Sequence, residues 1–147
     1  MKHCTRVITV NTERGPQFID ITDRVQDAID QSAIRNGFAV VYSRHTTAAI
    51  RINENEPLLL QDMESFLERV APPSAFYNHN DMDHRTVNLT EEEDANGHAH
   101  CQQLLLGASE TVPVVDGAML SGRWQRIFLV ELDRGRPREV IVQLVGE

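Results

Sequence analysis

The last third of the chain most constrains the fold, because it is a succession of short apolar runs separated by turn signals. The runs read "TVPVV", "AML", "WQRIFLVELD" and "EVIVQLVG", and they are rich in residues that favour strands. Asp116-Gly117 stands between the first two runs, and Asp-Gly in that place is typical of a two-residue hairpin turn. We therefore predict a β-meander in this part of the chain.

The first two thirds of the chain mix strand and helix patterns. "TRVITV" and "QFIDI" are predicted to form a hairpin, and "FAVVYS" and "HTTAAIRIN" to be strands. One helix is expected to run from Thr22, as its cap, to Gly37, as its left-handed end. A second is expected to begin at Pro57, and a third to end at Gly107. The stripe of the second helix that is predicted to face the core comprises Leu59, Leu60, Met63, Phe66, Leu67 and Val70.

Strands at both ends with helices between them predict an α+β fold. We expect a single domain over residues 1–147, with a largely antiparallel β-sheet or sandwich and two or three helices. A chain of 147 residues with 41% hydrophobic residues is long enough to bury one core without disulfides.

The net charge and the cysteines restrict the kinds of partner and the cellular compartment that we expect. A formal net charge of −8 argues against nucleic acid as a partner, because that affinity comes from clustered Lys and Arg. Cys4 and Cys101 are far apart and suit reduced thiols, and neither a signal-peptide core nor a membrane-length apolar run is present. We expect a soluble cytoplasmic protein without a membrane partner. The arginines that form a solvated face, or hold a small anion, include Arg123, Arg126, Arg134, Arg136 and Arg138.

A long polar segment lies between Pro72 and Glu93. It is too polar to bury and too long for a simple connection, and such loops are usually functional or disordered. The acidic run from Glu91 to Asp94 is interpreted as favourable charge at the N-terminus of the helix that ends at Gly107.

The stretch "DANGHAHCQQLLLG" contains two histidines, His98 and His100, whose role depends on the backbone. In a helix they diverge by about 200°, whereas in an extended chain they share a face. With His79, His84 and the more distant His45 they form either a metal site or a set of solvent-exposed side chains. Neither an HExxH motif nor a zinc-finger spacing decides between the two.

The carboxylates, the single tryptophan and the absence of certain motifs indicate which kinds of reaction the sequence permits and which it excludes. A carboxylate near a histidine can orient the ring, act as a general base or hold magnesium through water, and otherwise it is exposed charge. Trp124 suits core packing or binding equally. The sequence has no GxSxG, GxxxxGK[ST] or GxGxxG motif, which excludes the usual serine-hydrolase, P-loop and dinucleotide-binding sites. The carboxylates of interest are Glu54, Glu56, Asp62 and Asp94.

Five blocks of the chain resemble the YjbQ family, also called secondary thiamine-phosphate synthases. They read "HTTAAIRINENE", "YNHN", "DANGHAHCQQLLLGASETVPVVDG", "GRWQRIFLVELD" and "RPREVIVQLVGE", and they follow the family's order from Tyr42 to Glu147. The resemblance implies a small α+β protein that assembles as a homotrimer, with a histidine-lined site for a divalent metal, zinc or magnesium.

The resemblance also implies roles for individual residues. The metal ligands would be His45, His79 and His100, with His98 as a neighbour. Glu54 matches the family's "INE", and we expect Glu54 and Asp94, which precedes the histidine pair, to be the catalytic carboxylates. The chain departs from the family pattern in "GAMLSGRWQ", where Ser121 and Arg123 replace an apolar and a small residue. Either these two residues make the strand edge more polar, or Arg123 reaches a ligand near Trp124 and Gln125. The expected substrate-binding residues are Thr46, Thr47, Asn53, Asn96, Trp124 and Gln125, together with Arg123.

The activity that the resemblance implies joins a pyrimidine pyrophosphate to a thiazole phosphate and releases pyrophosphate. A cation and nearby donors would neutralise the phosphates, although histidines are unusual ligands for magnesium. The dedicated synthases are TIM barrels, for which this chain is too short, so the activity can be secondary to another reaction. The alternatives are a metal-dependent hydrolase, with Glu54 or Asp94 as its base, and a non-catalytic protein that binds a small anionic metabolite or stores metal.

Overall fold

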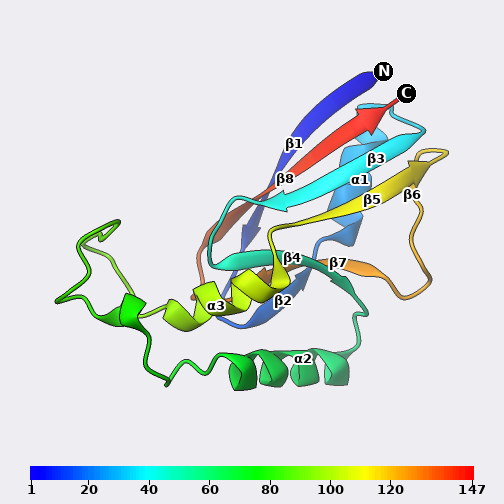
Figure 1. The fold of residues 1–147 in the computed structure, drawn as a ribbon. Helices are drawn as coiled ribbons and strands as arrows, with labels where there is room; N and C mark the ends of the chain where they lie inside the picture. Colours follow the sequence, from blue (N-terminus) through cyan, green and yellow to red (C-terminus); the bar gives the residue numbers. More distant parts are fainter.

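Two antiparallel sheets form the fold in the computed structural model, which describes residues 1–147 (Figure 1). The large sheet has the strand order β1-β8-β3-β5-β6, and the small sheet has the order β2-β7-β4. The strands of the large sheet are β1 (Lys2–Asn11), β8 (Pro137–Gly146), β3 (Gly37–Ser43), β5 (Ser109–Val115) and β6 (Ala118–Met119). Those of the small sheet are β2 (Gln17–Asp20), β7 (Arg126–Glu131) and β4 (Ala48–Asn53).

Three α-helices and one short 3-10 helix complete the structure. Helix α1 lies behind the large sheet, while α2 and α3 lie against the small sheet (Figure 1). The predicted α+β class with two or three helices is therefore confirmed. The helices are α1 (Thr22–Ser32), α2 (Pro57–Val70), η1 (Asn78–Asn80) and α3 (Gly97–Leu106).

The small sheet separates two hydrophobic cores. The larger core fills the space between the two sheets and α1, and it contains Val25, Ile50, Leu129 and Val142. The smaller core lies on the opposite face of the small sheet, where Phe128 of β7 packs near Leu67 of α2 and Ala99 of α3. Since β7 is covered on both faces, its side chains from Ile127 to Glu131 are all buried.

The predicted strand pairings were wrong at both ends of the chain. Strand β1 pairs with β8 and β2 pairs with β7, so the two N-terminal strands belong to different sheets. The C-terminal strands do not form a meander either, since only β5 and β6 are a hairpin and β7 crosses to the small sheet. A continuous apolar run such as that of β7 fits the centre of a sheet covered on both faces, but the run does not identify its partners.

The ends of α1 and α3 also differ from the prediction. Ala33, with a φ of 56°, is the left-handed residue after α1, whereas Gly37 begins β3. A Cβ at Gly37 would lie 2.0 Å from the carbonyl oxygen of Val145, so this glycine permits close strand contact. Helix α3 ends at Gly107 as predicted, but the acidic run ends at Asp94 and contributes nothing to the first turn of α3.

The apolar stripe predicted for α2 is only partly buried. Leu67 is buried, but Phe66 and Val70 are exposed on the outer side of the helix. Leu67 and the partly buried Leu60 pack into the smaller core, and part of the apolar face of the helix meets solvent. The helix begins at Pro57 as predicted, and Glu56 accepts hydrogen bonds from the backbone N–H groups of Leu58 and Leu59.

No helix of the structure is both long enough and apolar enough to cross a membrane.

Candidate functional site

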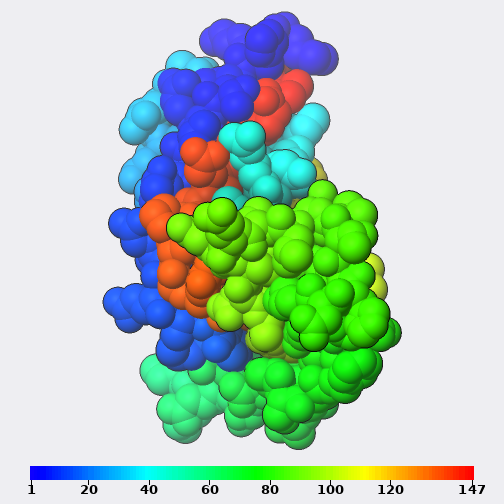
Figure 2. All heavy atoms as spheres, turned by 90° about the vertical axis from the view of Figure 1, so that its left-hand side faces the viewer, coloured from blue at the N-terminus to red at the C-terminus, as the bar shows by residue number.

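A polar pocket of about 480 Å³ forms where three distant parts of the chain meet. They are the connection between β3 and β4, the long loop with the start of α3, and the start of β8. In Figure 2 the green surface of the long loop lies beside the orange surface of the residues that precede and begin β8. Twelve residues line the pocket and none is hydrophobic, so its ligand must be polar or charged.

Two of the predicted metal ligands, His79 and His100, lie in contact inside this pocket. Their ring centroids are 4.6 Å apart and the rings are inclined by 73°. The Asn80 side chain fixes the loop by accepting a hydrogen bond of 2.9 Å from the Gly97 backbone N–H. A Cβ at Gly97 would lie 2.5 Å from the Cβ of Tyr77, so the glycine allows the loop to pack on the start of α3.

The third predicted ligand, His45, reaches the same pocket from the segment after β3. Its Nε2 accepts a hydrogen bond of 2.9 Å from the Glu139 backbone N–H, so in the neutral ring Nδ1 carries the proton. A metal bound through Nε2 would replace this hydrogen bond. Burial lowers the pKa of His45 below its ordinary value, and the nearby Arg138 charge lowers it further.

The electrostatics of the pocket favour the neutral forms of His45 and His100. Burial, and then the proximity of His79, lowers the pKa of His100. A neutral imidazole is the form that binds metal. Nε2 of His79 and Oδ1 of Asn96 are buried without a hydrogen-bond partner. These unpaired acceptor atoms in the pocket fit a bound cation, although no group of three or more His, Cys, Asp or Glu side chains is as closely spaced as a formed metal site.

A buried ion pair lies beneath the histidines. The Arg138 guanidinium donates to both carboxylate oxygens of Glu131, at 2.7 and 2.5 Å, and both side chains are almost fully buried. Thr12 donates to the same carboxylate, and Thr47 accepts from Arg138 through its hydroxyl at 2.9 Å. Because Thr47 precedes β4, this network joins β8 and β7 to the segment that carries His45.

A second network lies beside the first. Asp133 accepts hydrogen bonds from Arg136 and from Nδ2 of Asn96, the residue before α3. Nε of Arg136 is buried without an acceptor. The network therefore ties the start of α3 to the turn before β8 and leaves Nε of Arg136 and Oδ1 of Asn96 buried without partners.

One carboxylate of the long loop lines the pocket, and it is Glu93. Arg85 donates to Glu93 at 2.5 Å and also to the backbone carbonyl oxygen of Asn88. The hydrogen bond from Arg85 lowers the pKa of Glu93, so this carboxylate is ionised at neutral pH.

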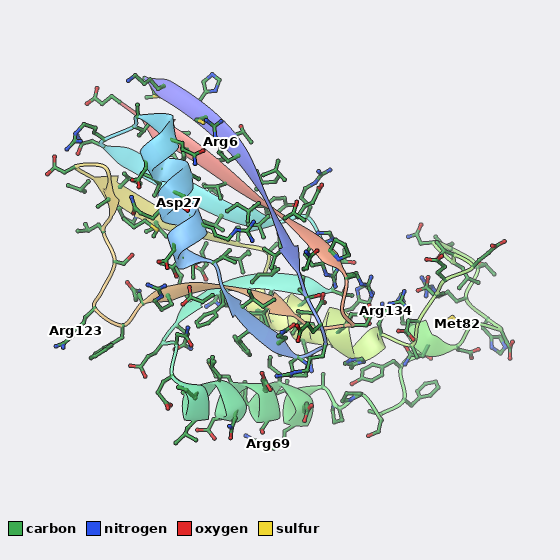
Figure 3. The ribbon with its side chains drawn as sticks, turned by 180° about the vertical axis from the view of Figure 1, so that it is seen from behind. Arg6, Asp27, Arg69, Met82, Arg123 and Arg134 are labelled. Atoms are coloured by element: carbon green, nitrogen blue, oxygen red, sulfur yellow. The ribbon has the colours of Figure 1, made fainter.

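The residues implied by the resemblance divide between two places. Thr46, Thr47 and Asn96 line the pocket with the three histidines. A separate depression of about 410 Å³ is lined by the other implied substrate-binding residues together with Glu54. Figure 3 shows Arg123 at the opposite end of the molecule from Arg134 and Met82, which mark the side of the pocket and the long loop. The implied residues at that opposite end are Asn53, Glu54, Arg123, Trp124 and Gln125.

Two further residues lie outside the pocket. Asp94 is exposed and forms an ion pair of 3.7 Å with Arg134. Both His98 and His100 lie in α3, where their side chains diverge, and His98 lies near the ring of Tyr77 instead of lining the pocket. The helical alternative in the sequence analysis is therefore the one that this backbone adopts.

Sequence reasoning missed Glu93 and did not assign the pocket arginines to the site. One signal was available for Arg138, which shares the inward face of "RPREVIVQLV" with Val140 and Val142. A buried arginine at such a position requires a buried carboxylate partner. Nothing in the local pattern distinguishes Glu93 from its acidic neighbours. The arginines that line the pocket are Arg44, Arg85, Arg136 and Arg138.

Comparison with known proteins identifies close relatives over the whole chain. A family model described as "UPF0047 protein YjbQ-like" matches residues 6–147. A UPF0047 protein of Methanothermobacter thermautotrophicus is 43% identical, with 100% of this chain and 95% of the relative covered. The YugU protein of Bacillus subtilis, also a UPF0047 protein, is 31% identical, with 96% and 98% covered.

Solved structures agree with the fold. A YbjQ-like protein of unknown function from Sulfolobus solfataricus is 37% identical and superposes with a TM-score of 0.89, with 99% of each chain covered. A YjbQ/UPF0047 protein from Clostridium acetobutylicum is 35% identical, with a TM-score of 0.84 and coverage of 95% of this chain and 99% of that one.

Proposed function

Since the chain belongs to the YjbQ-like UPF0047 family, we propose from the chemistry of its pocket that it is a metal-dependent enzyme acting on a small phosphorylated substrate. The observation that carries the proposal is the convergence of His45, His79 and His100 on one pocket that arginines also line. These histidines come from distant segments of the chain and belong to neither hydrophobic core.

The proposed metal ligands are His45, His79 and His100. Imidazole nitrogen suits zinc better than magnesium, which prefers oxygen ligands. Three protein ligands leave room for a substrate, as in catalytic zinc sites. When bound, the ion would supply charge that stabilises a departing phosphate or pyrophosphate.

The chain's own groups have separate proposed tasks. Arg138 is held rigidly by Glu131 and Thr47, so it can bind an anion without reorganising. Glu93 is ionised and held by Arg85, and it can accept a proton from an attacking group at the pocket wall. Glu93 is thus a better placed candidate base than Glu54 or Asp94, neither of which lines the pocket.

The first reaction to test is the joining of a pyrimidine pyrophosphate to a thiazole phosphate with release of pyrophosphate. The arginines and histidines support binding of the phosphate groups. The pocket of one protomer has no apolar residue to cover the two rings. Metal-dependent phosphate-ester hydrolysis is the second candidate, because it needs only the phosphate, water and a carboxylate such as Glu93.

We further propose a homotrimer in the cytoplasm. The outer face of the large sheet supports self-association, since its side chains Phe38 and Tyr42 are exposed apolar groups. On α3, Leu104 and Leu105 are exposed as well. Cys4 and Cys101 are unpaired, which suits a reducing compartment.

The test compares wild type with Glu93→Gln and the matched control Glu92→Gln on both candidate reactions. With added zinc, wild type should form thiamine phosphate or hydrolyse p-nitrophenyl phosphate, and a chelator should stop it. Glu93→Gln should lose about a hundredfold in rate if it is the general base, while Glu92→Gln should retain the wild-type rate. Absence of both reactions from zinc-loaded protein, or metal-independent rates, would overturn the proposal.

A further inference from the structure

A second depression, of about 640 Å³, lies beside the pocket and shares a wall with it. It is formed entirely by residues 78–88 of the long loop, and we call it the outer depression. His79, Arg85 and Asn88 line both hollows, so a ligand that passes over these three side chains can occupy both. The other residues that line the outer depression are Asn78, Asp81, His84 and Val87.

Two asparagine side chains of the outer depression are free to bind a ligand. An asparagine amide carries two N–H donors and an oxygen acceptor, and the amides of Asn78 and Asn88 make no hydrogen bond within the chain. The backbone of Asn88 is held, because its carbonyl oxygen accepts a hydrogen bond of 2.7 Å from Arg85. A ligand group that both donates and accepts, as a hydroxyl does, is the best match for these amides.

His84 adds an acceptor whose orientation is set by Asp81. Nδ1 of His84 lies 2.8 Å from one carboxylate oxygen of Asp81, and the His84 backbone N–H donates to the other oxygen at 3.3 Å. Because a carboxylate only accepts, Nδ1 is the donor, and Nε2 of the neutral ring is left as an acceptor. The side chain of His84 is 86% exposed, so Nε2 can accept a hydrogen bond from a ligand hydroxyl.

The composition of the outer depression disfavours two other kinds of ligand group. Arg85 is its only arginine and is paired with Glu93, whereas four arginines line the pocket, so a second phosphate finds few cations here. An apolar aromatic ring finds one hydrophobic side chain, that of Val87. A neutral group that is rich in hydroxyls meets the lining better than either.

We infer that the outer depression binds the organic part of the substrate and that the substrate is a phosphate monoester of a sugar or polyol. The inference rests on the proposed function, which assigns the phosphate to the pocket. Asn78, His84 and Asn88 would bind the hydroxyls and so determine specificity. Of the two candidate reactions it favours hydrolysis, because the joining reaction brings two aromatic rings to the site.

The test is a calorimetric titration of metal-free and zinc-loaded protein with inorganic phosphate, phenyl phosphate and ribose 5-phosphate. Wild type should bind ribose 5-phosphate about tenfold more tightly than the other two probes, the effect of one or two added hydrogen bonds. His84→Ala should reduce this preference about threefold, and the double variant Asn78→Ala, His84→Ala should abolish it. His3→Ala is the matched control, because His3 is exposed on β1 and lines neither hollow.

The outcomes separate this inference from the proposed function. A preference for ribose 5-phosphate that the double variant loses and His3→Ala retains would support the inference, even if the protein catalyses neither candidate reaction. Equal affinity for the three probes, tighter binding of phenyl phosphate, or a preference that the double variant retains would overturn it. Zinc-dependent hydrolysis of phenyl phosphate by the same protein would then leave the proposed function standing, whereas failure of all three probes to bind would overturn both.

Discussion

The histidine pocket and the tryptophan turn, residues 120–125, are two regions of contrasting construction. The pocket is lined by polar side chains that are held in buried networks, and several of its buried atoms have no partner. The tryptophan turn is open, and Trp124 is 61% exposed with the Arg123 guanidinium 4.6 Å from its ring centroid. Both regions contain residues that match the family pattern, yet they lie at opposite ends of the chain's fold (Figure 3). A resemblance in sequence therefore does not place its residues in one site.

The two regions also differ in the side-chain hydrogen bonds that stabilise them. Beneath the pocket, Glu131 and Arg138 are buried and bonded to each other and to Thr12 and Thr47. In the tryptophan turn the side-chain hydrogen bond is that of Gln125, whose Oε1 accepts from the Gly122 backbone N–H at 2.7 Å. We expect changes in the pocket to lower both the stability and the affinity for ligands, and changes in the turn to lower little of either within one chain.

The largest expected effect on stability is that of Arg138→Met. It leaves the Glu131 carboxylate buried without its cation, so the free energy of unfolding should fall by about 3–5 kcal/mol. The exposed Arg123→Met should change it by less than about 0.5 kcal/mol. Urea denaturation of both variants measures the difference. Equal stabilities would contradict the contrast between the two regions.

A smaller effect is expected from Gly97→Ala. The new Cβ would lie 2.5 Å from the Cβ of Tyr77, so the long loop must shift away from α3, at a cost of about 1–3 kcal/mol. Gly122→Ala is the matched change in the turn, where the nearest atom is the flexible end of Gln125 at 3.3 Å. Thermal melts should show a clear loss for the first and little for the second. A melting temperature of Gly97→Ala equal to wild type would show that the loop is not fixed by this contact.

The acid stability of the protein gives a third test, at an ion pair outside both regions. Burial raises the pKa of Asp20, but the hydrogen bonds from Arg126 and Thr22 outweigh it, and the pKa lies below its ordinary value of 3.8. The folded state therefore binds this proton more weakly than the unfolded state, and the stabilisation is present at neutral pH and lost as the pH falls through the lowered pKa. Asp20→Asn should be less stable than wild type at pH 7, and the difference between their free energies of unfolding should decrease below about pH 4. A difference in free energy of unfolding that stays constant with pH would show that Asp20 stabilises the fold without its charge.

The smallest expected effect is that of Trp124→Ala. The side chain is exposed, so the change should cost less than about 0.5 kcal/mol, and zinc and phosphate affinities should match those of wild type. Calorimetry on the assembled protein measures both affinities. A tenfold loss of either would mean that the tryptophan turn of one copy contributes to the histidine pocket of another, and the two regions would then be parts of one site.

The sequence was a good guide where local patterns decide the structure. The fold class, the start of α2 at Pro57, the Asp116-Gly117 hairpin and the end of α3 at Gly107 all followed from spacing and turn chemistry. The strand partners did not follow, because pairing between β1 and β8 depends on contacts across almost the whole chain. Local patterns carry no information on such distant pairings.

The candidate site was predictable to a similar extent. The resemblance selected His45, His79 and His100, and these three do line one pocket. Glu93 was not identified, because its place in the pocket depends on the hydrogen bond from Arg85 and not on any feature of the acidic run. The division between the pocket and the tryptophan turn could not be anticipated either, since it depends on how the two sheets direct the ends of their strands.

The central claim is that His45, His79 and His100 bind one metal ion, and zinc titration followed by elemental analysis tests it most directly. Wild type should bind one zinc per chain, and alanine at any of the three positions should abolish stoichiometric binding. His98→Ala and His84→Ala, which change histidines next to the pocket, should bind zinc as wild type does. Full zinc content in the His100→Ala variant, or equal loss in all five variants, would contradict the account.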